Sequence, residues 1–165
     1  MTPLAVSSYE LSLFLHITAV VVGFGATFAE SVAFPVAMKL DPRHLPYVHR
    51  LQLAINQWLA TPALVVVLAT GVYQAADADF EFGDFWLSGS MVIVIVLGGF
   101  IGGYFIPADR RLGPMVTREI EAAGDREVVL SPAYQRGART EGIVGTVAGV
   151  LIVIAIYLMV TKPGL

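Results

Sequence analysis

Four long apolar runs divide the 165-residue chain, and polar segments separate them. A membrane-spanning helix needs about 20 apolar residues, and each run reaches or approaches that length. Backbone groups in lipid must be satisfied within the segment, so continuous runs of this length favour helices over barrel strands. The pattern predicts an all-α fold, a single membrane domain over residues 1–165 built as a four-helix bundle. The expected helices are about 11–38, 51–74, 85–106 and 143–160, and a loop is expected at 107–142.

The composition also indicates a membrane protein. Hydrophobic residues make up 56% of the chain and charged residues 14%, whereas soluble proteins average about 45–50% and about 25%. The chain has no cysteine, which excludes a disulfide framework, a thiol nucleophile and a thiolate metal site. The lipid bilayer is therefore the expected partner, and no nucleic-acid partner is predicted.

Basic residues lie almost entirely in two of the polar segments. Of the ten Lys and Arg residues, nine lie between the first and second runs or between the third and fourth. The segment between the second and third runs has only acidic charges. Because cytoplasmic segments are enriched in Lys and Arg, the sequence predicts that residues 107–142 are cytoplasmic and that both termini lie outside.

Two dipeptides mark expected helix starts. Asp41-Pro42 and Ser131-Pro132 each place a capping residue before a proline, the combination typical of a helix N-terminus. The second dipeptide predicts that the fourth helix begins about ten residues before its apolar run. Residues 113–124 predict a short separate helix that ends before Gly124.

The first apolar run carries two ionisable residues, His16 and Glu30. Such residues are costly inside a membrane, so each is a candidate for a functional site. A helical step of about 100° per residue brings both onto one face. That face holds His16, Val20, Gly23, Thr27, Glu30 and Phe34. We predict that this face, with its small and polar residues, points into the bundle.

Glu30 is expected at the depth where the second helix begins. We predict a structural ion pair between Glu30 and Arg50, with a proton relay or a cation site as the alternative. The inner half of the second helix adds further polar side chains, which predict a partly hydrated cavity. They are Gln52, Asn56 and Gln57.

His16 lies near the outer end of the first helix. An imidazole there has three open roles: a structural hydrogen bond, a metal ligand or an axial ligand of haem iron. The predicted cofactor pocket around it combines its own helix face with the outer halves of the other helices. This set is His16, Gly23, Thr27, Thr70, Ser88 and Met91.

Glycines and one proline shape the middle of the helices. Helix three contains Gly98-Gly99 and Gly102-Gly103, and small residues at this spacing let helix backbones approach closely. We predict that Gly99, Gly102 or Gly103 lies against a neighbouring helix, with a homodimer through helix three as the alternative. Pro62 predicts a kink in helix two.

Several short motifs carry a family resemblance. The stretch LFLHITAVVVGFGATF resembles the first helix of small bacterial membrane proteins that have a Leu-His pair near the helix start. TPALVVVLATGVY looks like the second helix of the HemJ-type protoporphyrinogen oxidases, and Trp86-Leu87 opens helix three as in that family. The ending YLMVTKP is most similar to an uncharacterised membrane family near the HemJ-type and CopD-type (copper-resistance) proteins.

The resemblance implies a function. HemJ-type proteins are four-helix membrane proteins that bind haem b and oxidise protoporphyrinogen, using a His in helix one and a Lys early in helix three. His16 matches the His, whereas residues 87–91 contain no Lys, so the oxidoreductase activity stays open. The resemblance implies a multi-pass protein of the bacterial inner membrane that binds haem b or a porphyrin through His16, in redox chemistry or porphyrin handling.

Two other functions stay open from the residues. One is binding or transport of copper or another metal ion, with His16 as a ligand. The other is a structural membrane subunit that has no chemistry of its own.

Overall fold

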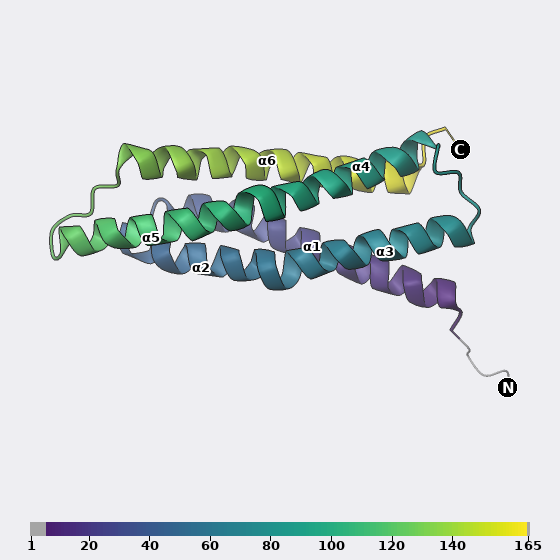
Figure 1. Cartoon of the computed structure of the whole chain (residues 1–165), viewed down its shortest axis with the longest axis horizontal. Coiled ribbons are helices and arrows are strands. Elements are labelled where there is room, and N and C mark those ends of the chain that lie inside the picture. Colours follow the sequence, from purple (N-terminus) through teal and green to yellow (C-terminus); the bar gives the residue numbers. More distant parts are fainter. Residues whose placement is uncertain (1–5, 165) are drawn as a thin grey trace.

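The computed structural model describes residues 6–164, and every regular element in that part of the chain is a helix (Figure 1). Short 3₁₀ and π segments extend or interrupt the α-helices. The elements are α1 (Ser8–Ala37), η1 (Pro42–His44), α2 (Leu45–Ile55), η2 (Asn56–Ala60), α3 (Thr61–Asp77), α4 (Phe85–Phe100), η3 (Ile101–Phe105), α5 (Ile106–Ala123) and α6 (Pro132–Thr161).

Within residues 6–164, four continuous helices are long and apolar enough to cross a membrane. They are Ser8–Ala37, Pro42–Asp77, Phe85–Ala123 and Pro132–Thr161. The predicted all-α fold with four spans is confirmed. Residues 107–142, predicted as the cytoplasmic loop between the third and fourth apolar runs, are largely helical. Helix three continues to Ala123, and α6 begins at Pro132, where the Ser131-Pro132 pair predicts a helix start. The helices continue beyond the apolar runs into segments that are mostly polar. On α5, Ala108, Leu112 and Val116 form a buried apolar stripe, so this polar segment still packs as a helix.

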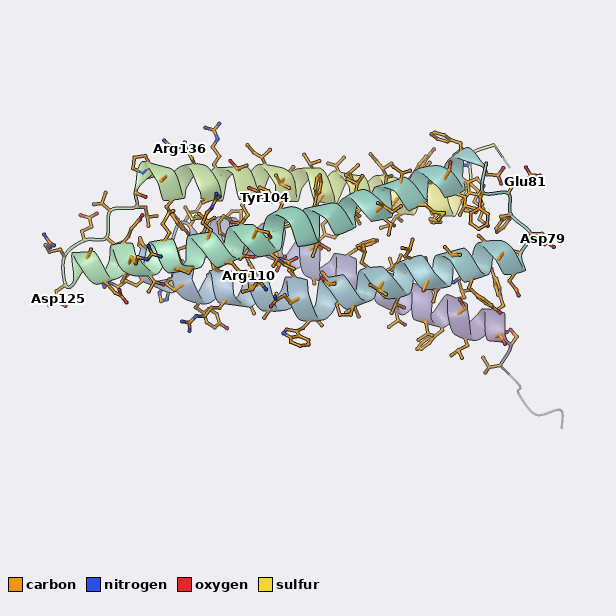
Figure 2. The ribbon with its side chains drawn as sticks, viewed as in Figure 1. Asp79, Glu81, Tyr104, Arg110, Asp125 and Arg136 are labelled. Carbon is orange, nitrogen blue, oxygen red and sulfur yellow. The ribbon has the colours of Figure 1, made fainter. Side chains whose placement is uncertain are left out.

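The two ends of the bundle differ in charge. Figure 2 shows Asp79 and Glu81 at one end, and Asp125 and Arg136 at the other. We call the first the acidic end, where α1 starts and α6 finishes, and the second the arginine-rich end, which holds residues 38–50 and 110–139 (Figures 1 and 2). The bundle thus separates its charges as the sequence predicts, and placement of the arginine-rich end in the cytoplasm stays a prediction.

Three helix pairs make up most of the packing. α1 packs along α3, α4 packs along α6, and α2 packs along α5. α1 also contacts α6, which closes the bundle into a ring. At the arginine-rich end, a buried apolar cluster surrounds the fully buried Tyr134 of α6. Its other buried members are Phe34, Ala37, Leu45, Leu112, Val116 and Ala138.

Each π segment comes directly before an X-Pro pair. η2 is followed by Thr61-Pro62, and η3 is followed by Ile106-Pro107. A proline has no N–H and clashes with the carbonyl of the preceding turn, and a widened turn accommodates it. Thr61 Oγ1 donates a hydrogen bond of 2.7 Å to the Asn56 carbonyl. The kink predicted at Pro62 therefore takes the form of a π segment.

The predicted helix starts are confirmed. The Ser131 hydroxyl accepts a hydrogen bond of 3.2 Å from the Tyr134 N–H, and the Asp41 carboxylate accepts one of 2.9 Å from the Arg43 N–H. Gly124 ends α5 with a φ of 57°, a value that favours glycine. The helix predicted before it is not separate, because α5 is continuous with η3 and α4.

The glycine prediction for helix three is wrong within this chain. A Cβ placed on Gly99, Gly102 or Gly103 would have no other atom within 4 Å, so these glycines do not lie against a neighbouring helix. Gly98 does, because its Cβ would lie 2.9 Å from Leu64 Cδ2 of α3. Gly98 lies beside the buried Val94 and Leu97 on the inward stripe of α4. Dimerisation through helix three stays a prediction.

Candidate functional site

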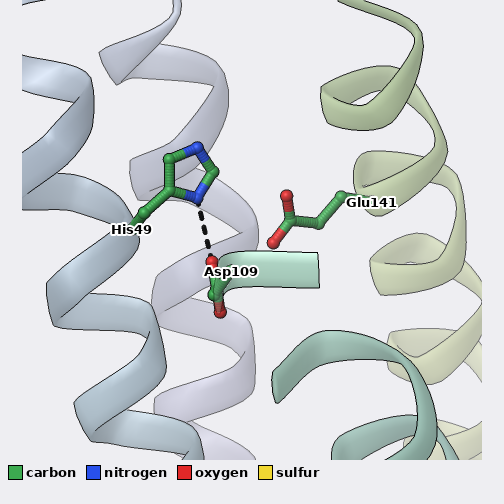
Figure 3. A group of neighbouring side chains, drawn as sticks. All are labelled: His49, Asp109 and Glu141. Carbon is green, nitrogen blue, oxygen red and sulfur yellow. Dashed lines mark hydrogen bonds and ion pairs between the residues drawn. The ribbon is translucent and has the colours of Figure 1, made fainter. Parts of the chain in front are cut away.

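A buried imidazole joins three helices at the arginine-rich end. His49 of α2 is 1% exposed, its Nδ1 lies 2.9 Å from Asp109 Oδ1 of α5, and its Nε2 lies 2.9 Å from the Tyr134 hydroxyl of α6. Figure 3 shows the His49–Asp109 contact, with Glu141 of α6 on the other side of the Asp109 carboxylate. The His49 and Tyr134 rings meet edge to face, with 5.8 Å between centroids.

Helical periodicity places these polar residues inward. On α2 and η2, the buried positions Leu45, His49, Gln52 and Asn56 recur at intervals of four, three and four residues. On α6, Tyr134, Ala138 and Glu141 recur at intervals of four and three. Each polar group therefore occupies a position of the stripe that faces the core.

Three ligand-type side chains converge at this point. His49, Asp109 and Glu141 each offer one atom, a ring nitrogen or a carboxylate oxygen, within 4.8 Å of the other two. Asp109 is 2% exposed and Glu141 is 4% exposed. Asp109 Oδ2 and both carboxylate oxygens of Glu141 are buried and have no hydrogen-bond partner among residues 6–164. We call these three residues the His49–Asp109–Glu141 centre.

An internal cavity of about 120 Å³ begins beside Glu141. It lies between the four spans and extends toward the middle of the bundle, where Ala19, Val67 and Ile152 line it. Glu30 Oε1 and Gln52 Oε1 are further unpartnered acceptors, and both side chains line this cavity. The volume is enough for several water molecules and lies below the roughly 300 Å³ typical of a site for a drug-sized ligand.

The centre is rich in acidic groups and poor in cations. The His49–Asp109 contact is the single contact within ion-pair distance among the described residues, so no Lys or Arg side chain lies within that distance of these carboxylates. Carboxylates away from water need a bound proton, a paired cation or a metal ion. The arrangement can therefore hold protons or a cation.

The predicted ion pair between Glu30 and Arg50 is wrong. Glu30 Oε1 has no partner and Glu30 lines the cavity, whereas Arg50 is exposed in a groove between α2 and α5. Successive residues of a helix differ in direction by about 100°. Since His49 occupies the inward position of α2, the next residue, Arg50, points away from the core. The cavity predicted beside helix two is present. Gln52 and Asn56 line it, and Gln57 is not among its lining residues.

His16 lies against α3, toward the acidic end. Its Nδ1 is 2.9 Å from Thr70 Oγ1, and the Thr70 hydroxyl donates to the Val66 carbonyl. The Thr70 proton is thus engaged, so the His16 Nδ1–H donates to Thr70 Oγ1. The bond leaves His16 Nε2 without a hydrogen-bond partner in residues 6–164.

The residues of the predicted pocket around His16 do not form one site. His16 and Thr70 are brought together, but Gly23 and Thr27 line the internal cavity. Ser88 and Met91 of α4 lie at neither place, although Leu97 and Phe100 of the same helix line the cavity. The Ser88 hydroxyl donates to the Asp84 carbonyl, and Met91 packs against the buried cluster of Ala75, Trp86, Leu87 and Leu158.

Asp109, Tyr134 and Glu141 are absent from the sequence-predicted site. Their positions lie outside the four apolar runs, where no site was predicted. The predicted partner of Glu30 was Arg50, the residue next to His49 in the sequence. The available signal is the apolar spacing of Ala108, Leu112 and Val116, which continues the helix beyond the apolar run. The inward stripe of α6 likewise extends back to Tyr134.

The fold and the centre define a four-span membrane protein with a buried acidic and imidazole site. The chain belongs to the family of predicted integral membrane proteins named DUF2269, whose model matches residues 10–163. No curated protein and no solved structure matches the chain. The expected membership of an uncharacterised membrane family is thereby confirmed, whereas the relation to HemJ-type and CopD-type proteins stays a prediction.

Proposed function

We propose that this membrane protein binds a divalent metal cation at the His49–Asp109–Glu141 centre. The observation that carries the proposal is the set of three buried, unpartnered carboxylate oxygens on Asp109 and Glu141. They lie beside an imidazole whose ring nitrogen is within 4.8 Å of both carboxylates. Leaving such oxygens unpaired in a buried site is costly, and a cation would satisfy all of them.

The second contact of His49 suits a metal ligand. His49 Nδ1 and Asp109 Oδ1 are 2.9 Å apart, which fits two ligands at about a right angle, each about 2.0–2.1 Å from one ion; tetrahedral ligands would lie roughly 3.3 Å apart. With a metal bound, Nδ1 would offer its lone pair and the Nε2–H would donate to the Tyr134 hydroxyl. Metal-binding imidazoles usually donate their second N–H to such a partner, which fixes the ring orientation.

The donor atoms narrow the kind of ion. One nitrogen and several carboxylate oxygens suit zinc, manganese or iron(II), whereas copper(I) prefers thiolate or thioether sulfur. The chain has no cysteine, and Met91 lies in the cluster around Trp86. Two ionised carboxylates would also balance the charge of a divalent ion.

The internal cavity supports movement of the ion as well as binding. The cavity begins at Glu141, and the unpartnered oxygens of Glu30 and Gln52 offer further oxygen ligands for an ion along it. A purely structural metal site is normally closed by its ligands. We therefore include passage of the ion between the centre and the cavity in the proposed function.

Metal titration of the purified protein tests the proposal. Protein stripped with a chelator should bind one zinc or manganese ion per chain by calorimetry, and its thermal midpoint should rise. A free ion concentration a hundredfold above Kd adds about 2.7 kcal/mol of stability. Asp109→Asn and Glu141→Gln should each abolish the response, whereas Asp125→Asn, which removes an exposed carboxylate of the α5–α6 connection, should leave it intact.

Equal responses in the wild type and both centre variants would refute the metal centre, and so would no response in any of them. The centre would then be a hydrogen-bonded Tyr134–His49–Asp109 chain beside the Glu141 carboxyl group. Proton handling would become the leading function.

Haem b at His16 is the second candidate. The observation that favours it is the Thr70 bond to Nδ1, which leaves Nε2 available to an iron ion or to copper. Protein expressed with haem supplementation should show a Soret band that His16→Ala removes. Absence of the band refutes haem, and an unchanged copper content in His16→Ala refutes copper at this residue. A subunit without chemistry is the function left if metal binding, proton handling and haem binding all fail.

A further inference from the structure

A groove between α2 and α5 opens on the outside of the bundle at the arginine-rich end. Its charged rim consists of Arg50, Arg110 and Arg118, and Glu121 is the single exposed acidic side chain that lines it. Leu53, Pro46 and Pro114 provide apolar surface between the charges. The groove encloses about 520 Å³, enough for a bulky headgroup.

The three guanidinium groups are not engaged elsewhere. None of them forms an ion pair or a side-chain hydrogen bond within residues 6–164, where the one ion pair is His49–Asp109. Arg43 and Arg126 differ, because their guanidinium groups donate to backbone carbonyls. Arg43 bonds the α5–α6 connection, and Arg126 bonds the last turn of α5. The groove thus offers unpaired planar donors, which match the oxygens of a phosphate group.

Exposed apolar side chains follow the groove along the same span. Trp58 is 78% exposed and lies eight residues after Arg50 on the same span, or about 12 Å further along the helix. Leu51 and Leu59 are also exposed on this stretch. A lipid with its phosphate at the arginines would therefore have exposed apolar side chains of the same span within reach of its acyl chains, on the side toward the membrane interior.

We infer that the α2–α5 groove binds the phosphate of an anionic phospholipid, with the acyl chains lying along the apolar surface toward Trp58. Basic pockets between membrane helices bind such headgroups. The groove also contacts His49 and Asp109 from the side away from the internal cavity. A bound lipid would therefore cover the outer side of the His49–Asp109–Glu141 centre. The inference does not depend on a metal being bound there.

Native mass spectrometry of the metal-free protein tests the inference. The protein in detergent is titrated with phosphatidylglycerol and, separately, with the zwitterionic phosphatidylcholine. We expect one phosphatidylglycerol to remain bound under conditions that remove phosphatidylcholine. The triple variant Arg50→Gln, Arg110→Gln, Arg118→Gln should bind phosphatidylglycerol roughly a hundredfold more weakly.

The matched control removes three arginines at the same end outside the groove. Arg111→Gln, Arg136→Gln and Arg139→Gln together make the same charge change, and Arg111 and Arg136 line a different groove. This control should keep the affinity. Equal loss in both triple variants would show a general charge effect and overturn the site, as would equal binding of the two lipids. Displacement by millimolar inorganic phosphate would identify a soluble-anion site instead.

Discussion

Gly23 of α1 and Ala63 of α3 touch so closely that a Cβ on Gly23 would lie 2.7 Å from Ala63 Cβ. Both residues line the internal cavity. Gly25, two residues further along α1, has no such neighbour within 4 Å. The absence of a side chain at Gly23 therefore sets how closely α1 and α3 approach beside the cavity.

We predict that Gly23→Ala destabilises the protein. The added methyl group pushes α1 from α3, and overpacking of this kind costs about 1–3 kcal/mol. That cost exceeds the gain in helix propensity of about 1 kcal/mol. Thermal unfolding in detergent measures the effect, and Gly25→Ala is the control, expected to be neutral or slightly stabilising. A Gly23→Ala midpoint equal to that of Gly25→Ala would contradict the close packing.

His16 and Thr70 should be energetically coupled. We expect His16→Leu and Thr70→Val to destabilise the protein less in combination than as the sum of the single effects, because each removes the same hydrogen bond. Polar contacts between membrane helices contribute about 0.6 kcal/mol on average. A double-mutant cycle by reversible unfolding measures the coupling. Thr146→Val serves as the comparison, since Thr146 bonds the Gly142 carbonyl of its own helix, and strict additivity for Thr70 would disprove the bond.

Glu30 and Arg50 should act independently. Because Arg50 is exposed in the groove and Glu30 faces the cavity, we expect the effects of Glu30→Gln and Arg50→Gln to add within about 0.5 kcal/mol. The same unfolding measurement on His49→Gln and Asp109→Asn provides a coupled pair for comparison, since these side chains are 2.9 Å apart. A coupling above about 1 kcal/mol between Glu30 and Arg50 would restore the ion pair.

The orientation in the membrane can be measured with single thiols, because the native chain has none. Val129→Cys, at a position 80% exposed at the arginine-rich end, should resist a membrane-impermeant thiol reagent in intact cells. Ala78→Cys, exposed at the acidic end, should react. Permeabilised cells should label both variants. The reverse pattern in intact cells would invert the topology.

The sequence predicts the membrane helices well because their signal is local. Length and apolarity alone define a span, and capping residues such as Ser131 define its start. The apolar runs alone understate the length of helices three and four, because residues 106–123 and 132–142 are polar on average, and a mean over residues hides a one-sided apolar stripe. Leu112 and Val116 carry that stripe on α5. Periodicity is therefore the better guide outside the lipid.

The site was less predictable because it depends on rotation about each helix. The sequence places Glu30 and Arg50 at one depth, but a single residue step decides that His49 faces inward in place of Arg50. Contacts such as His49 with Asp109 and Tyr134 join residues 60 and 85 positions apart. No local pattern in one sequence specifies such pairs.

The widened turns η2 and η3 have a mechanical consequence. A helix bends most readily where its regular hydrogen bonding is interrupted, and these two interruptions contact each other across the bundle. α2 and α5 lie beyond them as a packed pair, carrying His49 and Asp109, whereas Glu141 belongs to the uninterrupted α6. Rocking of this pair about the two turns would carry His49 and Asp109 away from Glu141, so the turns that bend the helices would also separate the three side chains of the centre.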